Sequence, residues 1–330
     1  MAKIVLGIGT SHGPMLVTET EVWGARVPAD KVNRHAWQGQ SWTFDELVAA
    51  RRDEGLREQI TQEAWDMRQR LCQAAIEELA DRFEEARIDV AVVIGNDQME
   101  IFDERLIPAF GVHYGDTITN HEFSPDRMAK LPPGIAESVP GYIPAGGADY
   151  PGHPELARAI IAQAMQDEFD VAAMKALPKP ETPHAYGFVC RRLMRDRPVP
   201  MVMVTVNTFY PPNQPTVKRC HAFGKSVLKA IANWNSDARV AVIASGGLTH
   251  FVIDENVDRI FLDALRSADM SQVEALGEAI FQDGTSEMKN WVPVAAVMAD
   301  LGLAPHVVDY VPCYRSEAGT GNAMGFVYWD

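Results

Sequence analysis

The chain has 330 residues, and its 45 acidic against 30 basic side chains give a formal net charge of −15 at pH 7. This excess of negative charge opposes binding to nucleic acid and to anionic membranes, so we expect small molecules or proteins as ligands. No apolar run reaches membrane-spanning length and the N-terminus lacks the order of a signal peptide, which predicts a cytoplasmic protein. The four cysteines lie far apart and form no CxxC pair, which argues against a disulfide framework or a zinc ribbon.

Polar side chains follow three apolar runs that predict buried strands. Lys3 to Gly9 leads into His12, Val90 to Ile94 leads into Asp97, Gln98 and Glu100, and Arg239 to Ala244 leads into His250. In open α/β sheets ligands bind at the carboxyl ends of the strands, so these side chains are candidates for contact with a substrate or a metal. A simpler interpretation stays open for each strand end, namely an Asx turn or a histidine that makes only structural hydrogen bonds.

Amphipathic helices alternate with the predicted strands. Apolar positions between Thr61 and Arg87 fall on one helical face, and further helices are predicted over Glu155 to Asp167 and Lys218 to Trp234. Another buried strand is predicted over Val199 to Val206. This order predicts an α/β fold with a central mixed, largely parallel sheet flanked by helices, in one domain over residues 1–330.

Two segments interrupt this pattern. Residues 21–55 contain scattered tryptophans and show no clear period, which indicates an insertion that packs on the surface or at a subunit contact. Residues 131–152 are rich in proline and glycine and predict a long loop, and loops of this length in compact domains are often functional. We expect both segments to shape the mouth of a pocket.

Two further residues have side chains that could take part in catalysis or metal binding, but neither belongs to a recognisable motif. Glu287, in DGTSEMKNW, opens a predicted helix through Val297, in which Pro293 either causes a kink or lies in the first turn. A carboxylate at this position has a plain alternative role, because the N-terminus of a helix favours negative charge. His184 lies in a loop between prolines and a predicted helix.

Six blocks of sequence, in this order, resemble the class III extradiol ring-cleaving dioxygenases. They are GIGTSHGPML, VVIGNDQMEIFDERLIPAF, GHPELARAIIAQAMQDEFD, VTVNTFYPPNQPTVKRCHAFG, ASGGLTHFVID and GTSEMKNW. The chain is most similar in type to the catalytic subunit of protocatechuate 4,5-dioxygenase and to the dioxygenases of gallate and 3-O-methylgallate. The resemblance implies an enzyme that uses O₂ to open the ring of a catecholic or gallate-like aromatic acid.

The resemblance also implies roles for individual residues. The family holds Fe(II) with two histidines and one glutamate, a triad that leaves positions open for a catecholate and O₂. His12 matches the first histidine and Glu287 the glutamate. His250 matches the acid/base histidine, which takes a proton from the catechol. His184 matches a histidine that lines the substrate pocket.

The chain departs from the family at the second histidine of the triad, where it has Gln98. A neutral amide is a weaker ligand than imidazole, so the metal affinity changes or a divalent metal other than Fe(II) is bound. Strand alternation places Glu100 on the same side as Gln98, where its carboxylate could substitute as a ligand. Gln98 also supports an alternative function: a protein of the same fold that is a non-catalytic subunit or catalyses a different metal-dependent reaction. A third alternative is a small-molecule binding module without chemistry.

The substrate contacts are predicted from position alone. A carboxylate on the ring needs a basic or hydroxyl partner, and Tyr186, Tyr210 and Arg315 are the residues that we considered for it. The resemblance implies a homo-oligomer, since the family forms dimers or larger assemblies.

Overall fold

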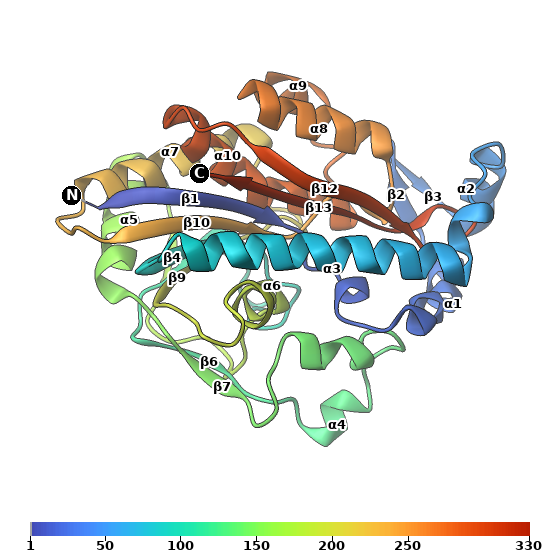
Figure 1. Cartoon of the computed structure of the whole chain (residues 1–330), viewed down its shortest axis with the longest axis horizontal. Coiled ribbons are helices and arrows are strands. Elements are labelled where there is room, and N and C mark those ends of the chain that lie inside the picture. The colour runs from blue at the N-terminus through green and yellow to red at the C-terminus, as the bar shows by residue number, and fades with distance from the viewer. Residues whose placement is uncertain (1) are drawn as a thin grey trace.

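The computed structural model describes residues 2–330 and is built around a nine-stranded sheet (Figure 1). Along the sheet the strands follow the order β11-β13-β1-β10-β4-β9-β5-β8, and β12 pairs with β13. Their bounds are β1 (Lys3–Thr10), β4 (Val90–Gly95), β5 (Phe110–His113), β8 (Ala172–Met174), β9 (Met201–Val206), β10 (Arg239–Ser245), β11 (His250–Val252), β12 (His306–Tyr314) and β13 (Thr320–Trp329).

The centre of the sheet is parallel and its flanks are mixed. Strands β1, β10, β4 and β9 pair in parallel, as do β5 and β8. Strand β5 runs antiparallel to β9, and β13 runs antiparallel to β1, β11 and β12. The prediction of a mixed, largely parallel central sheet is therefore confirmed. The parallel strands bring the ends of β1, β4 and β10 to one edge.

Helices cover both faces of the sheet because the strands are apolar on both sides. In β4, Val90, Val92 and Ile94 pack on the face covered by α5, α7 and α10, and Ala91 and Val93 pack on the face covered by α3 and α6. Figure 1 shows the long α3 lying across the sheet. The main helices are α3 (Gln62–Glu85), α5 (Pro154–Gln166), α6 (His184–Phe188), α7 (Val217–Asn233), α8 (Glu255–Ser267), α9 (Ser271–Ala275) and α10 (Trp291–Asp300).

The predicted helices agree with these bounds to within about two residues, which is the usual uncertainty of helix ends. Local capping explains where two of them begin. The Thr61 hydroxyl accepts a hydrogen bond from the backbone N–H of Ala64, and the Thr216 hydroxyl accepts one from Arg219. The helix expected to open at Glu287 differs, because Asp283–Asn290 forms a 3-10 segment (η6) and α10 starts at Trp291. Pro293 lies in the first turn of α10, where its missing N–H costs little.

Residues 21–55 form a series of short elements, which explains why the sequence shows no period there. They are η2 (Thr20–Arg26), α1 (Val27–Val32), β2 (His35–Trp37), β3 (Gln40–Trp42) and α2 (Phe44–Ala50). Phe44 and Leu47 pack with Val252 and Ala318, so this segment lies against the strands at the C-terminal side of the sheet. Thr43 and Glu46 form a capping box that fixes the start of α2.

The proline- and glycine-rich residues 131–152 are partly ordered into secondary structure. They contain η4 (Ala136–Gly141) and β7 (Ala148–Pro151), and β7 pairs with β6 (Thr117–Asn120) outside the main sheet. The remaining short elements are η1 (Pro14–Leu16), η3 (Glu58–Ile60), α4 (Pro125–Met128) and η5 (Val189–Leu193).

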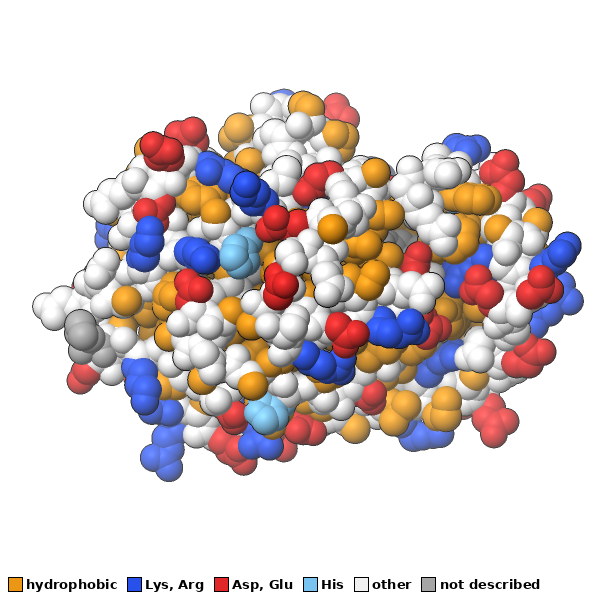
Figure 2. Space-filling model, turned by 90° about the horizontal axis from the view of Figure 1, so that it is seen from above, with side chains coloured by type: hydrophobic (Ala, Val, Ile, Leu, Met, Phe, Trp, Pro, Cys, Tyr) orange, Lys and Arg blue, Asp and Glu red, His pale blue; other side chains and the backbone are white. Residues whose placement is uncertain are grey.

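The surface carries charges of both signs. In the view of Figure 2, Lys and Arg side chains lie among Asp and Glu side chains, with apolar patches between them. Within residues 2–330, no helix combines the length and apolar character that crossing a membrane requires. All four cysteines are buried free thiols.

Candidate active site

The carboxyl ends of the central strands border a cavity of about 340 Å³. This volume lies in the range of small-molecule sites, about 300–1,000 Å³. Its polar end is lined by His12, Gln98, Glu100, His184, His250 and Glu287. The structure thus brings together six of the residues that the sequence singled out for metal binding or acid/base chemistry, while Asp97 lies outside the cavity lining. The other walls are mostly apolar and come from residues 14–23 and 123–143.

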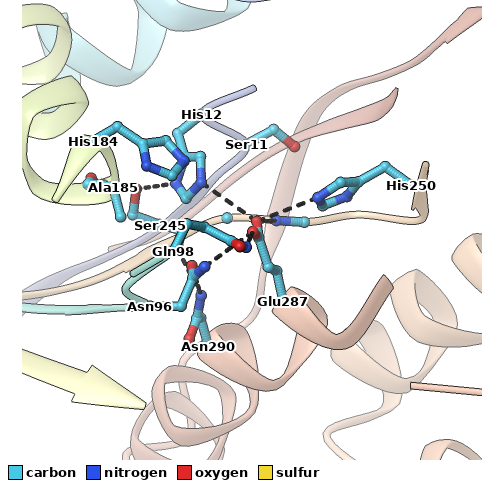
Figure 3. A network of polar contacts seen from close by, with 12 residues as sticks. Ser11, His12, Asn96, Gln98, His184, Ala185, Ser245, His250, Glu287 and Asn290 are labelled. Atoms are coloured by element: carbon cyan, nitrogen blue, oxygen red, sulfur yellow. Dashed lines mark hydrogen bonds and ion pairs between the residues drawn. The ribbon is translucent and has the colours of Figure 1, made fainter. Parts of the chain in front are cut away.

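Glu287 is the centre of the polar end (Figure 3). Its side chain is buried, and Oε1 accepts hydrogen bonds from Asn96 Nδ2 and Gln98 Nε2, each over 3.0 Å. Oε2 accepts a hydrogen bond of 3.1 Å from the backbone N–H of Gly247. Burial alone would raise the pKa of Glu287, but the nearby rings of His250 and His12 hold this pKa well below the usual range. The carboxylate is therefore ionised at neutral pH.

His12 presents one defined nitrogen to Glu287. The Ser245 hydroxyl donates its hydrogen to the Ala185 carbonyl over 2.6 Å, so its oxygen must accept the hydrogen bond of 2.9 Å from His12 Nδ1. This places the ring hydrogen on Nδ1 and leaves a lone pair on Nε2, which lies 3.3 Å from Glu287 Oε2. Burial, the largest influence, lowers the pKa of His12 and favours this neutral form.

His250 approaches the same carboxylate oxygen from another strand. Its Nδ1 lies 2.8 Å from the Leu248 carbonyl, which can only accept, so Nδ1 carries the hydrogen of the neutral ring. The Nε2 lone pair then lies 3.6 Å from Glu287 Oε2. The preceding Thr249 is fixed by Asp258, whose carboxylate accepts from the Thr249 N–H over 2.9 Å and from its hydroxyl over 2.7 Å.

When both rings are neutral, their Nε2 lone pairs and the Glu287 carboxylate face one another with no hydrogen between them. Two donors that bind one divalent ion at about 2.1 Å lie roughly 3.0–3.4 Å apart, and the 3.3 Å between His12 Nε2 and Glu287 Oε2 falls in this range. The arrangement fits a cation between His12 and Glu287, with His250 beside it. Within residues 2–330, however, His, Cys, Asp and Glu side chains form no group of three with metal-site spacing. The amide of Gln98 lies beside Glu287 instead.

The two ends of the Gln98 amide have different partners. Nε2 donates to Glu287, while Oε1 accepts a hydrogen bond of 3.2 Å from the Tyr210 hydroxyl. These two partners decide which atom of the amide is nitrogen and which is oxygen. A turn of the amide by about 180° would direct its oxygen to the cation position. Tyr210 therefore contacts the site through Gln98 and does not itself line the cavity.

Glu100 does not point to the same place as Gln98. Met99 between them has a positive φ of 59°, which breaks the strand alternation behind that prediction. Glu100 Oε1 lies 2.9 Å from His184 Nδ1 and also accepts from the His184 backbone N–H over 2.8 Å. Asp97 has the structural role of an Asx turn, because its carboxylate accepts from the backbone N–H groups of Glu100, Ile101 and Phe102.

His184 is the first residue of α6, and its ring packs edge-on against His12 with a centroid distance of 4.5 Å. Burial would lower the pKa of His184, but the charge and hydrogen bonds of Glu100 outweigh it and raise the pKa to about 9. The ring is therefore an imidazolium at neutral pH, paired with the Glu100 carboxylate.

Two of the residues considered as substrate contacts have structural partners. Tyr186 is fully buried outside the cavity lining, and its hydroxyl donates to the Val204 carbonyl over 2.7 Å. Arg315 lines the cavity, but its guanidinium makes two hydrogen bonds of 2.8 Å to Asp30. Tyr186 thus lies away from the cavity, and Arg315 lines it with its charge paired to Asp30.

Sequence reasoning missed the residues that support the site. Ser245 orients His12, and Asn290 Nδ2 donates to Asn96 Oδ1 and to the Ser245 carbonyl, each over 2.9 Å. Asn96 and Ser245 lie at the ends of β4 and β10, so their positions at strand ends could have identified them as site residues. Asn290 lies in the block GTSEMKNW, but only Glu287 of that block was singled out.

Residues 48–318 match the family described as "Catalytic LigB subunit of aromatic ring-opening dioxygenase". The chain belongs to this family. The resemblance stated from the sequence blocks is thereby confirmed, and the LigB family range includes Gln98, His184, His250 and Glu287 but not His12.

Two individual proteins are similar to this LigB family member. A gallate dioxygenase from Pseudomonas putida (strain KT2440) is 32% identical over 124 residues, which are 34% of this chain and 35% of that protein. The match thus spans about a third of the relative's length. The crystal structure of the uncharacterized protein JW3007 from Escherichia coli K12 has a TM-score of 0.47 and 14% sequence identity, covering 77% of this chain and 91% of the other.

Proposed function

We propose that this LigB family member is an extradiol dioxygenase that opens the ring of a catecholic or gallate-like aromatic acid. In this reaction the ring bond beside the diol breaks and both atoms of O₂ enter the product. The observation that carries the proposal is the convergence of His12 Nε2 and His250 Nε2 on Oε2 of Glu287, at 3.3 and 3.6 Å, in the wall of the cavity. The gallate dioxygenase relative supports the choice of substrate class.

A non-heme divalent ion, Fe(II) in our proposal, would be held by His12 and Glu287. The third protein donor would be the amide oxygen of Gln98, a weaker ligand than imidazole. When bound, such an ion brings a catecholate and O₂ together and supplies the electronic coupling between them.

The protein side chains provide acid/base chemistry and orientation. In the neutral ring of His250, Nδ1 donates to the Leu248 carbonyl, and the Nε2 lone pair takes a hydroxyl proton from the catechol. The same ring later returns the proton to an oxygen of the opened product. The His184 imidazolium uses Nδ1 for Glu100 and keeps Nε2–H as a donor for an oxygen on the ring. The apolar walls hold the ring and exclude water.

Oxygen uptake tests the proposal directly. Anaerobically purified protein is loaded with Fe(II), analysed for metal, and offered catechol, protocatechuate, gallate and 3-O-methylgallate. We expect one O₂ consumed per ring opened, with a yellow ring-fission product. His250→Phe should retain the metal and lose about 10²- to 10⁴-fold in turnover. Absence of uptake by metal-loaded protein, or unchanged turnover of His250→Phe, would contradict the proposal.

One observation favours a second candidate, a protein of the same fold with an altered role. Gln98 Nε2 donates to Glu287 Oε1, so the nitrogen of the amide and not its oxygen faces the carboxylate that would hold a metal. A non-catalytic subunit, or an enzyme for another metal-dependent reaction, would keep this contact. Oxygen uptake by Gln98→His but not by the natural chain would favour this candidate.

A further inference from the structure

Three arginines line the cavity, and two of them have carboxylate partners. Arg315 is held by Asp30 through two hydrogen bonds, and the Thr320 hydroxyl also donates to Asp30 over 2.7 Å. Arg127 forms an ion pair with Glu181 and stacks on the Phe123 ring, 3.7 Å from its centroid. The charges of these two arginines are therefore neutralised within the protein.

Arg26 is the remaining cation of the cavity. Within residues 2–330, its guanidinium has no carboxylate within ion-pair distance and makes no hydrogen bond, although the side chain is half-buried. Burial first, and the charge of Arg315 second, lower the pKa of Arg26, and Asp30 offsets this only in part. A guanidinium stays charged in a protein, so this environment favours the arrival of an anion.

Its backbone position keeps Arg26 at the cavity. It is the last residue of η2 and precedes α1, and its aliphatic stem crosses Gly134 of the proline- and glycine-rich loop. A Cβ at Gly134 would lie 3.1 Å from Arg26 Cγ, and Gly134 has a φ of +80°. Glycine at this position therefore leaves space for the stem while permitting the turn.

We propose that Arg26 binds the carboxylate of the aromatic acid and so selects acidic over neutral catechols. The planar fork of a guanidinium matches the two oxygens of a carboxylate, and an apolar surround that includes Trp23 strengthens the pair. The assignment rests on the proposed function for the identity of the ring, but it differs from the position-based choice of Arg315.

Binding without turnover tests the assignment. Metal-loaded protein under argon is titrated with protocatechuate and with catechol, which differ only in the carboxylate, and the Kd is measured by calorimetry. The natural chain should bind protocatechuate about 10- to 100-fold more tightly than catechol. Arg26→Met should remove this preference and leave the Kd of catechol unchanged. Arg26→Lys should keep part of it, and the matched control Arg127→Met, which removes a paired arginine of the same cavity, should keep all of it.

Each contrary result has a definite meaning. Equal Kd values for the two ligands in the natural chain, or equal weakening of both in Arg26→Met, would overturn the role of Arg26. Oxygen uptake with an unchanged KM for protocatechuate in Arg26→Met would overturn it while the dioxygenase function stands. Binding of benzoate that depends on Arg26, in a protein that consumes no O₂ with any catechol, would instead support the anion site and refute the dioxygenase function.

Discussion

The hydroxyl of Ser245 fixes which nitrogen of His12 faces Glu287. It donates to the Ala185 carbonyl and accepts from His12 Nδ1, so the hydrogen-bond direction along this chain of three groups is determined. Partners of this kind orient metal-binding histidines and raise their basicity. The hydrogen bond between Ser245 and His12 connects the end of β10 to the end of β1. Ser245 therefore acts as a positioning residue.

Ser245→Ala should weaken Fe(II) binding about 10- to 100-fold, because His12 loses the acceptor that fixes its tautomer and ring orientation. Anaerobic titration of metal-free protein with Fe(II) measures the Kd. Ser286→Ala is the matched control, since the Ser286 hydroxyl is buried and has no hydrogen-bond partner within residues 2–330. Equal Kd values for Ser245→Ala and the natural chain would show that His12 is held without this hydrogen bond.

Gln98→His should tighten Fe(II) binding, on the order of tenfold or more, because an imidazole replaces the amide as a donor. The same titration measures the effect. Tyr210→Phe serves as the control, since it removes only the hydroxyl that donates to Gln98 Oε1. A Kd that stays the same or rises in Gln98→His would mean that the protein donors of the metal do not include position 98.

Glu100→Gln should change how stability depends on pH. The pKa of His184 is about 9 in the folded chain, against 6.5 ordinarily, so the pairing stabilises fully below about pH 6.5 and is lost as the pH rises through about 9. The contribution is at most about 3 kcal/mol, because both side chains are partly exposed to solvent. Urea unfolding of metal-free protein should show a large difference between the natural chain and Glu100→Gln at pH 6 and a small one at pH 9.5. A constant difference would refute the raised pKa.

Asp30→Asn should destabilise the fold by about 3–5 kcal/mol, because it leaves the guanidinium of the buried Arg315 without its charge partner. Urea unfolding measures the change in free energy. Arg57→Ala is the comparison, since its ion pair with Glu317 also joins the early part of the chain to the C-terminal strands but is solvent-exposed. That variant should lose less than about 1 kcal/mol. Similar losses in both variants would contradict the argument from burial.

Much of the scaffold could be predicted from the sequence because local signals and tertiary structure agree there. Apolar runs such as Val90 to Ile94 suit a sheet covered on both faces, and Thr61 marks the start of α3. The strand ends also gave His12 and His250. What failed depended on single backbone torsions or on contacts distant in sequence. The positive φ of Met99 redirected Glu100, and the partner of Arg315, Asp30, lies in a segment without periodicity.

The location of Arg26 shows the same limit. Its sequence neighbours give no hint of a ligand, and the role that we propose for it depends on the other two cavity arginines having partners. Position in the sequence led instead to Arg315, whose charge is paired with that of Asp30. Whether an arginine is neutralised depends on the carboxylate beside it, and a carboxylate far away in sequence cannot be identified as its partner from one sequence alone.

The residues around Glu287 come from both ends of the polypeptide: His12 follows the first strand, and Glu287 precedes the last helix. A ribosome must therefore release almost the whole chain before the first and last of these side chains can meet. If His12 and Glu287 hold a metal as proposed, its site forms only when these two distant segments have folded together, so metal binding would depend on the folded chain.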